Sequence, residues 1–190
     1  MCYGLSIVMK ISVFIATSLD GFIARLNGDI DWLVNADDHA DYGYEAFIAT
    51  VDCLVIGRNS FEKVLSFPEW PYAGMRVVVL SRTLITIPEQ AAGKIEISAG
   101  PVEQLAASLK AEGLGRIYID GGRTVQSFLR AGLVTDMTLT RIPVLIGSGL
   151  PLFGELPRDI RLDHIETKTY RSGFVQSLYE LRKDHSTAVR

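Results

Sequence analysis

The stretch that most constrains the fold is residues 115–129, where a β-branched and aromatic run ends in a glycine pair and a helix-periodic segment begins at once. A strand that turns through bare backbone into a helix leaves several N–H donors and the positive end of the helix dipole facing one point. This arrangement suits a diphosphate, because glycines let a ligand approach the backbone without an intervening Cβ. Taken alone, Gly121-Gly122 is more often an ordinary tight turn, so a binding role needs further support.

Strands and helices alternate along most of the chain, which predicts an α/β fold with a largely parallel sheet covered on both faces. The expected strands are 10–16, 53–56, 76–80, 94–98, 116–119, 135–141, 161–170 and 174–181. The expected helices run from 37 or 38 to about 50, from 57–60 onward, over 101–112, and from the glycine pair to 131. The last two strands flank Arg171-Ser172-Gly173, a three-residue loop that predicts an antiparallel hairpin.

The first expected helix has an apolar stripe and a capping residue. Asp37 or Asp38 can cap its start. The spacing i, i+3, i+4 and i+7 predicts which side chains face the sheet, namely Tyr44, Phe47, Ile48 and Val51. Residues 17–35, which hold turn-forming pairs at 20–21 and 27–28, are expected to form one long irregular loop. A loop of this length in a compact domain is usually functional or mobile.

Composition limits the partners of the chain. The 190 residues have a net charge of −3 and no lysine- or arginine-rich block, which argues against a nucleic-acid surface. An anionic ligand would therefore need a local positive site. No segment approaches the length of a membrane span, so we expect no membrane partner and a cytoplasmic location. Met9 directly precedes the first strand, so residues 1–8 are expected to be an extension, 9–183 a single domain and 184–190 a polar tail.

The two cysteines and three histidines form no recognisable ligand pattern. Cys2 and Cys53 give neither a disulfide framework nor paired metal-ligand spacing, and Cys53 lies in an apolar run typical of a buried strand. His39, His164 and His185 are far apart in sequence. We therefore expect no metal site.

Two further strand ends carry polar residues. Gly57-Arg58-Asn59-Ser60 opens a helix directly after a short strand, and Ser81-Arg82 follows the next one. An arginine at such a point can hold a phosphate, although singly each is as well explained by solvated surface residues. Ligand contacts concentrate at the carboxyl ends of parallel strands. Three such ends in one sheet favour a dinucleotide site, and the Ser-Arg pair favours a ribose 2′-phosphate and hence NADP.

These residues are part of a wider resemblance. The chain resembles the dihydrofolate reductase-like family, most closely the reductase domain of bifunctional riboflavin-biosynthesis proteins (the RibD C-terminal domain) and its stand-alone relatives. The likeness covers residues 10–181. Its markers are Ser-Leu-Asp-Gly-Phe-Ile-Ala at 18–24, Val-Ile-Gly-Arg at 55–58, Val-Leu-Ser-Arg at 79–82, Ile-Asp-Gly-Gly-Arg at 119–123 and Pro-Val-Leu-Ile-Gly-Ser-Gly at 143–149. The resemblance implies a three-layer fold whose mostly parallel central sheet ends in a C-terminal antiparallel hairpin.

The resemblance also implies NADPH as cofactor and a position for each contact. The diphosphate would rest on the backbone of Gly121, Gly122, Arg123 and Thr124. The second helix start, Gly57, Arg58, Asn59 and Ser60, would lie near the adenosine-side phosphates. Ser81 and Arg82 would flank the 2′-phosphate, and Ala16 and Ile23 would lie against the nicotinamide. Family members with the Asp-Gly-Gly form, as at 120–122 here, are of the riboflavin type, whereas folate reductases carry a third glycine in place of Asp120.

The proton donor is less well defined. Folate reductases carry a carboxylate on the first helix, for which Asp41 and Glu45 are the candidates here. Asp41 lies roughly 70° and Glu45 roughly 110° from the centre of the apolar stripe, so Asp41 is preferred. For Asp41 itself, a solvated helix carboxylate is favoured over a catalytic one. Asp20, in the turn of the long loop, and an ordered water are the other candidates.

The function implied by the resemblance is an NADPH-dependent reductase. It would transfer a hydride to a C=N or C=O group of a small heterocyclic substrate of the pterin or ribosylaminopyrimidine class. Relatives often form homodimers, so a homodimer is expected. The alternative is a non-catalytic NADP- or pterin-binding module with the same fold.

Overall fold

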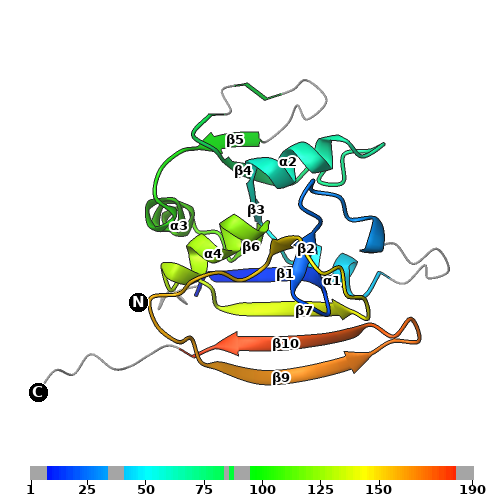
Figure 1. Ribbon diagram of the computed structural model, residues 1–190. Coiled ribbons are helices and arrows are strands. Elements are labelled where there is room, and N and C mark those ends of the chain that lie inside the picture. Colours follow the sequence, from blue (N-terminus) through cyan, green and yellow to red (C-terminus); the bar gives the residue numbers. More distant parts are fainter. Residues whose placement is uncertain (1–7, 34–40, 84–85, 88–94, 183–190) are drawn as a thin grey trace, which may run out of the picture.

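The computed structural model describes residues 8–33, 41–83, 86–87 and 95–182. Within them, eight strands form one sheet in the order β5-β4-β3-β6-β1-β7-β10-β9, which runs from top to bottom in Figure 1. Their bounds are β1 Lys10–Ser18, β3 Cys53–Gly57, β4 Arg76–Leu80, β5 Ile95–Ser98, β6 Arg116–Asp120, β7 Asp136–Ile142, β9 Leu162–Thr169 and β10 Val175–Leu181.

Six neighbouring strands, from β5 to β7, are parallel. β10 pairs antiparallel with β7, and β9 pairs antiparallel with β10. The turn between β9 and β10 is closed by the Tyr170 N–H, which donates to the Phe174 carbonyl at 2.9 Å. The predicted mostly parallel sheet with a C-terminal antiparallel hairpin is confirmed.

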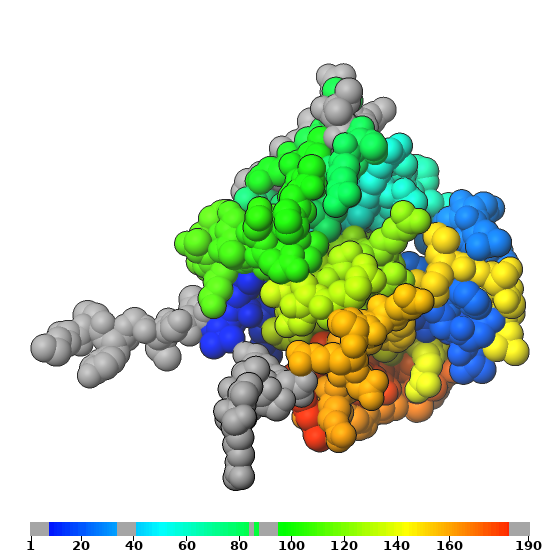
Figure 2. All heavy atoms as spheres, turned by 60° about the vertical axis from the view of Figure 1, so that its left-hand side comes forward, coloured from blue at the N-terminus to red at the C-terminus, as the bar shows by residue number. Residues whose placement is uncertain are grey.

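Helices cover both faces of the sheet. They are α1 Tyr44–Ile48, α2 Arg58–Leu65, α3 Val102–Ala111 and α4 Gly122–Arg130, with a 3-10 turn at Asp31–Leu33. Strand β3 shows why two layers form, because alternate residues point to opposite faces. Cys53 and Val55 join the core under α3 and α4, whereas Leu54 and Ile56 join the core under α1 and α2. Figure 2 shows α3 and α4 side by side on their face.

The first helix is shorter than predicted. It begins at Tyr44 because Tyr42 and Gly43 have left-handed backbones, with φ of 53° and 81°. Asp41 precedes the helix and accepts hydrogen bonds from the N–H groups of Gly43 and Glu45, each at 3.0 Å. The predicted caps at 37 and 38 lie outside the described residues. The predicted stripe is confirmed, since all four of its side chains pack against the core under α1 and α2.

The long loop is more ordered than predicted. β1 extends to Ser18, and β2 Phe22–Ala24 pairs antiparallel with β8 Leu150–Pro151 in a separate small sheet. A three-residue strand is too short to show a period in sequence, and its partner lies more than 120 residues further along. Residues 34–35 of the predicted loop lie outside the described residues.

Residues 1–7 and 183–190 lie outside the described part, so the predicted extension and polar tail stay predictions. In the described ranges, the structure contains no helix with the length and apolar character needed to cross a bilayer.

Candidate functional site

Two strand-to-helix junctions lie next to each other at one edge of the sheet. β3 and β6 are neighbours, so α2 and α4 begin side by side. A Cβ on Gly121 would collide with Ser60 Oγ at the start of α2, and a Cβ on Gly57 would lie 2.9 Å from Thr124 Oγ1 in α4. Each glycine thus makes room for a hydroxyl of the other helix. Gly121 also has φ of 92°, a conformation that other residues rarely adopt.

The start of α4 leaves backbone donors outside the helical ladder. Its first intrahelical bond runs from the Val125 N–H to the Gly121 carbonyl at 2.9 Å, so the N–H groups of residues 122–124 precede that ladder. A Cβ on Gly122 would lie 2.8 Å from the Pro151 carbonyl and 3.2 Å from Ile23 Cδ1. The small β2–β8 sheet therefore approaches the helix start as closely as bare backbone allows.

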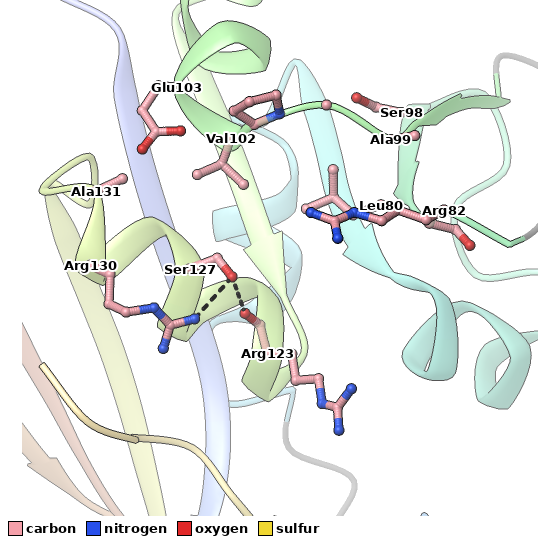
Figure 3. A pocket seen from close by; sticks show the side chains of 13 residues that line it. Leu80, Arg82, Ser98, Ala99, Val102, Glu103, Arg123, Ser127, Arg130 and Ala131 are labelled. Atoms are coloured by element: carbon pink, nitrogen blue, oxygen red, sulfur yellow. Dashed lines mark hydrogen bonds between the residues drawn. The ribbon is translucent and has the colours of Figure 1, made fainter.

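An arginine-lined cleft of about 530 Å³ lies on the α3–α4 side of this edge. Arg82 enters it from the end of β4, while Arg123 and Arg130 come from α4 (Figure 3). The Arg130 guanidinium donates to Ser127 Oγ at 3.3 Å, and Ser127 donates to the Arg123 carbonyl at 2.8 Å. Glu103 is the acidic residue in the lining, so the cleft has a positive balance that suits an anion.

A second cavity of about 470 Å³ lies on the α1–α2 side. Six of the residues selected from sequence line it: Ala16, Ile23, Asp41, Asn59, Ser60 and Gly121. Much of its wall is aromatic, with Phe14, Tyr42, Tyr44, Phe67, Tyr118 and Phe174. A largely apolar cavity with a few polar groups is typical of a site for a small organic ligand.

The start of α4 connects the two cavities. Gly121 lines the aromatic cavity, whereas Arg123, two residues later, lines the arginine cleft. An elongated ligand that reached from one to the other would pass over the backbone donors of residues 122–124.

Asp120 is a site residue that the sequence analysis did not select. It ends β6, lines the aromatic cavity, and has its pKa raised to about 6, chiefly because the surrounding protein removes water from the carboxyl. Tyr118 Oη donates to the Phe14 carbonyl at 2.9 Å and approaches Asp120 Oδ1 at 3.4 Å. Tyr44 and Tyr72 line the same cavity, and burial raises the pKa of each. A carboxyl that keeps its proton up to about pH 6 is suited to acid catalysis.

The two predicted carboxylates have other partners. Asp41 lies at the cavity lining but is exposed, and the backbone N–H groups of Gly43 and Glu45 lower its pKa. Asp20 lines neither of these two cavities. It accepts hydrogen bonds from Ser18 Oγ at 2.6 Å and from the Gly147 N–H at 2.8 Å, and the Ser18 bond is the largest cause of its lowered pKa. Both groups are therefore ionised at neutral pH.

The side chains of several predicted cofactor residues contact other parts of the protein. Arg58 donates to Glu62 Oε1 at 2.7 Å and to Thr83 Oγ1 at 2.6 Å, and it lines neither of the two cavities. Thr124 is buried with its hydroxyl facing Gly57. Ser81 lines the arginine cleft, where its Oγ accepts the Thr83 N–H at 3.2 Å.

Asp20 should be a stability residue. It joins the β1–β2 turn to the segment after β7, so we expect Asp20→Ala to lower the melting temperature at pH 7. Because its folded-state pKa lies below 3.8, this contribution is present above that pH and is lost as the pH falls through the folded value. The melting temperatures of wild type and variant should therefore converge as the pH falls below 3.8. Equal melting temperatures at pH 7 would contradict this role.

Comparison with known proteins assigns the chain to a family. The RibD C-terminal domain family matches residues 9–176. YwjB of Bacillus subtilis, an uncharacterized protein, is 35% identical over 164 residues, which cover 85% of this chain and 92% of YwjB. YyaP of the same organism, also uncharacterized, is 30% identical over 182 residues, covering 90% of this chain and 94% of YyaP.

Solved structures agree with this assignment. A Shewanella sp. PV-4 protein provisionally assigned to riboflavin biosynthesis is 40% identical, with a TM-score of 0.86 over 92% of this chain and 100% of that one. The diaminohydroxyphosphoribosylaminopyrimidine deaminase/5-amino-6-(5-phosphoribosylamino)uracil reductase of Thermotoga maritima shares the fold, with a TM-score of 0.70 at 15% identity over 92% of this chain and 57% of that one. Sequence and fold agree that this chain belongs to the RibD C-terminal domain family.

Proposed function

We propose that the protein is an NADPH-dependent reductase that transfers a hydride to a C=N or C=O carbon of a small heterocyclic substrate. The observation that carries this proposal is the start of α4, where Gly121 lines the aromatic cavity and Arg123 lines the arginine cleft. A dinucleotide has a charged, phosphate-bearing end and a planar redox end joined by a diphosphate. The cleft matches the phosphate-bearing end, the cavity matches the planar redox end, and the backbone donors between them match the diphosphate.

The residues present fit this cofactor. The N–H groups of residues 122–124 would bind the diphosphate, and Arg82 and Arg123 would bind the 2′-phosphate of the adenosine end. Ala16 and Ile23 would form the apolar surface against the nicotinamide. NADPH supplies the hydride when bound, so the task of the chain is to orient the two reactants and exclude water.

Asp120 would supply the proton. Hydride addition to a C=N or C=O carbon leaves negative charge on the nitrogen or oxygen, and a nearby acid must neutralise it. Asp120 lines the cavity and holds its proton to about pH 6. Tyr118 Oη, 3.4 Å from Asp120 Oδ1 and bonded to the Phe14 carbonyl, would position the carboxyl. The reductase activity in the name of the Thermotoga maritima relative is consistent with this chemistry.

Calorimetry and turnover assays test the proposal directly. We expect heat of binding with NADPH, and loss of nicotinamide absorbance when a pterin or a ribosylaminopyrimidine is added. Cofactor binding without turnover on either class would favour the alternative, a non-catalytic NADP- or pterin-binding module. Absence of heat with both NADPH and NADP⁺ would overturn the proposal.

Arg82 should determine the preference for NADPH over NADH. Removing a charge-assisted phosphate contact with Arg82→Ala should raise the Kd for NADPH about tenfold or more and leave the Kd for NADH nearly unchanged. Arg182→Ala is the matched control, because Arg182 pairs with Asp163 beside the start of β7, at the opposite edge of the sheet. An equal loss of affinity for both cofactors would place Arg82 away from the 2′-phosphate.

A further inference from the structure

The aromatic cavity has little positive charge to offer a ligand. Its charged lining residues are Asp41, Asp120 and Lys63, so among the described lining residues Lys63 is the one cation. The Lys63 ammonium is already paired with Asp29 Oδ1 at 2.9 Å. The balance of fixed charge around this cavity is therefore negative.

The contrast with the neighbouring cleft is sharp. That cleft gathers Arg82, Arg123 and Arg130 against Glu103. Anionic groups bind where such side chains or backbone donors compensate them, because an uncompensated charge is costly to remove from water. Among the described lining residues, the site thus separates a cleft with three arginines from a cavity whose one lysine is already paired with an aspartate.

The walls of the cavity suit a flat ring. Tyr42 is held in its left-handed conformation by the C-terminal hairpin, since Gln176 Nε2 donates to its carbonyl at 2.9 Å. Its ring stacks on Phe174 with centroids 4.9 Å apart and planes at 26°, and meets Tyr170 edge-on at 4.7 Å. On the sheet side, Phe14 stacks on Phe47 at 4.8 Å. Rings fixed in this way favour planar, weakly polar ligands.

We propose that the substrate of this site is an uncharged planar heterocycle that carries neither a phosphate nor a carboxylate group. This inference rests on the proposed reductase function for the identity of the site. It separates this chain from the Thermotoga maritima relative, whose name specifies a phosphoribosylated uracil. Asp41 would accept hydrogen bonds from ring or exocyclic N–H groups and would repel an anion, while Asp120, in its acid role, would face the atom that takes the proton.

Matched fluorescent probes test the preference. Binding of 6-hydroxymethylpterin is compared with that of pterin-6-carboxylate and of 6-hydroxymethylpterin phosphate, with the full chain and with saturating NADP⁺ present. We expect the neutral pterin to bind about tenfold or more tightly than either anion. In turnover assays, 5-amino-6-ribosylaminouracil should likewise be preferred over its 5′-phosphate. Equal or tighter binding of the anions, or binding of none of the three pterins, would overturn the inference.

The ion pair offers a gain-of-binding variant. Asp29→Asn releases Lys63 and should strengthen binding of the two anionic pterins about threefold or more, with the neutral pterin unchanged. Asp31→Asn is the matched control, because Asp31 lies in the same loop but pairs with Arg25, which does not line the cavity. An unchanged preference in Asp29→Asn would also overturn the inference.

NADPH calorimetry separates this test from that of the proposed function. Heat with NADPH but no discrimination among the pterins would leave the reductase proposal standing and remove the substrate class. Discrimination among the pterins without any heat from NADPH or NADP⁺ would leave the ligand class standing and remove the reductase proposal.

Discussion

Replacing Asp120 by asparagine is expected to lower the rate of hydride transfer about 100- to 10,000-fold, the range that a positioned general acid contributes. The Kd for NADPH should stay within about twofold, because Asp120 lines the aromatic cavity and not the arginine cleft. Asparagine keeps the shape of the side chain and removes the transferable proton. Single-turnover kinetics followed by nicotinamide absorbance measure the change.

The pH profile gives this prediction a second readout. The carboxyl, whose pKa is raised to about 6, is protonated below that value, so wild-type kcat/KM should fall as the pH rises above 6. Asp120→Asn should lack this descending limb. Asp41→Asn is the matched control and should keep it, because the pKa of Asp41 is lowered by backbone N–H groups. A full rate in Asp120→Asn would remove the residue from the mechanism.

Stability separates a catalytic loss from misfolding. A raised carboxyl pKa means that ionisation costs the folded state more than the unfolded chain, so wild-type stability falls as the pH rises from about 4 through 6. Asp120→Asn removes this cost. The melting temperature of Asp120→Asn minus that of wild type should therefore be larger at pH 8 than at pH 5. Such a cost to stability is expected of a residue kept for function.

The second large effect is expected from Gly121→Ala. The backbone of Gly121, with φ of 92° and ψ of 139°, costs a residue with a Cβ roughly 1–3 kcal/mol, and here the methyl group would also collide with Ser60 Oγ. The starts of α2 and α4 must then move apart, which displaces the donors of residues 122–124. We expect the Kd for NADPH to rise about tenfold or more, together with a lowered melting temperature.

Gly113→Ala is the matched control for this variant. Gly113 has φ of +85°, close to that of Gly121, but a Cβ there would meet no atom within 4 Å. It should lose stability through the backbone alone and bind NADPH normally. Equal binding of NADPH by both variants would show that the α4 start does not hold the diphosphate.

The sheet was predictable because its signals are local. The apolar run at 53–56 has no polar residue to mark a solvent face, which is typical of a strand buried on both sides, and the structure places Val55 and Ile56 in opposite cores. The helix before it was predicted too long because Tyr42 adopts a left-handed backbone that is rare for its residue type. The hairpin contacts that stabilise Tyr42 come from more than 120 residues away, at Ser172 and Gln176.

The candidate site was predictable in outline and less so in chemistry. Glycines at strand ends pointed to the two helix starts that the structure brings together at Gly57 and Gly121. The engagement of Arg58 by Glu62 follows from i,i+4 spacing, a signal present in the sequence. The raised pKa of Asp120 has no such signal, because it depends on burial by side chains that several elements contribute.

The small β2–β8 sheet has a consequence for the order of events. Its strands are held to each other and, through the Pro151 carbonyl and Gln126 Nε2 at 3.2 Å, to α4; the Leu152 N–H also donates to the Gly21 carbonyl at 3.1 Å. A ligand bound to the α4 backbone therefore lies against the same small sheet that lines the aromatic cavity through Ile23, Ala24 and Leu150. A dinucleotide on the α4 start should reduce the mobility of this sheet and so order the wall of the aromatic cavity. We therefore expect the dinucleotide to bind first and the hydride acceptor second.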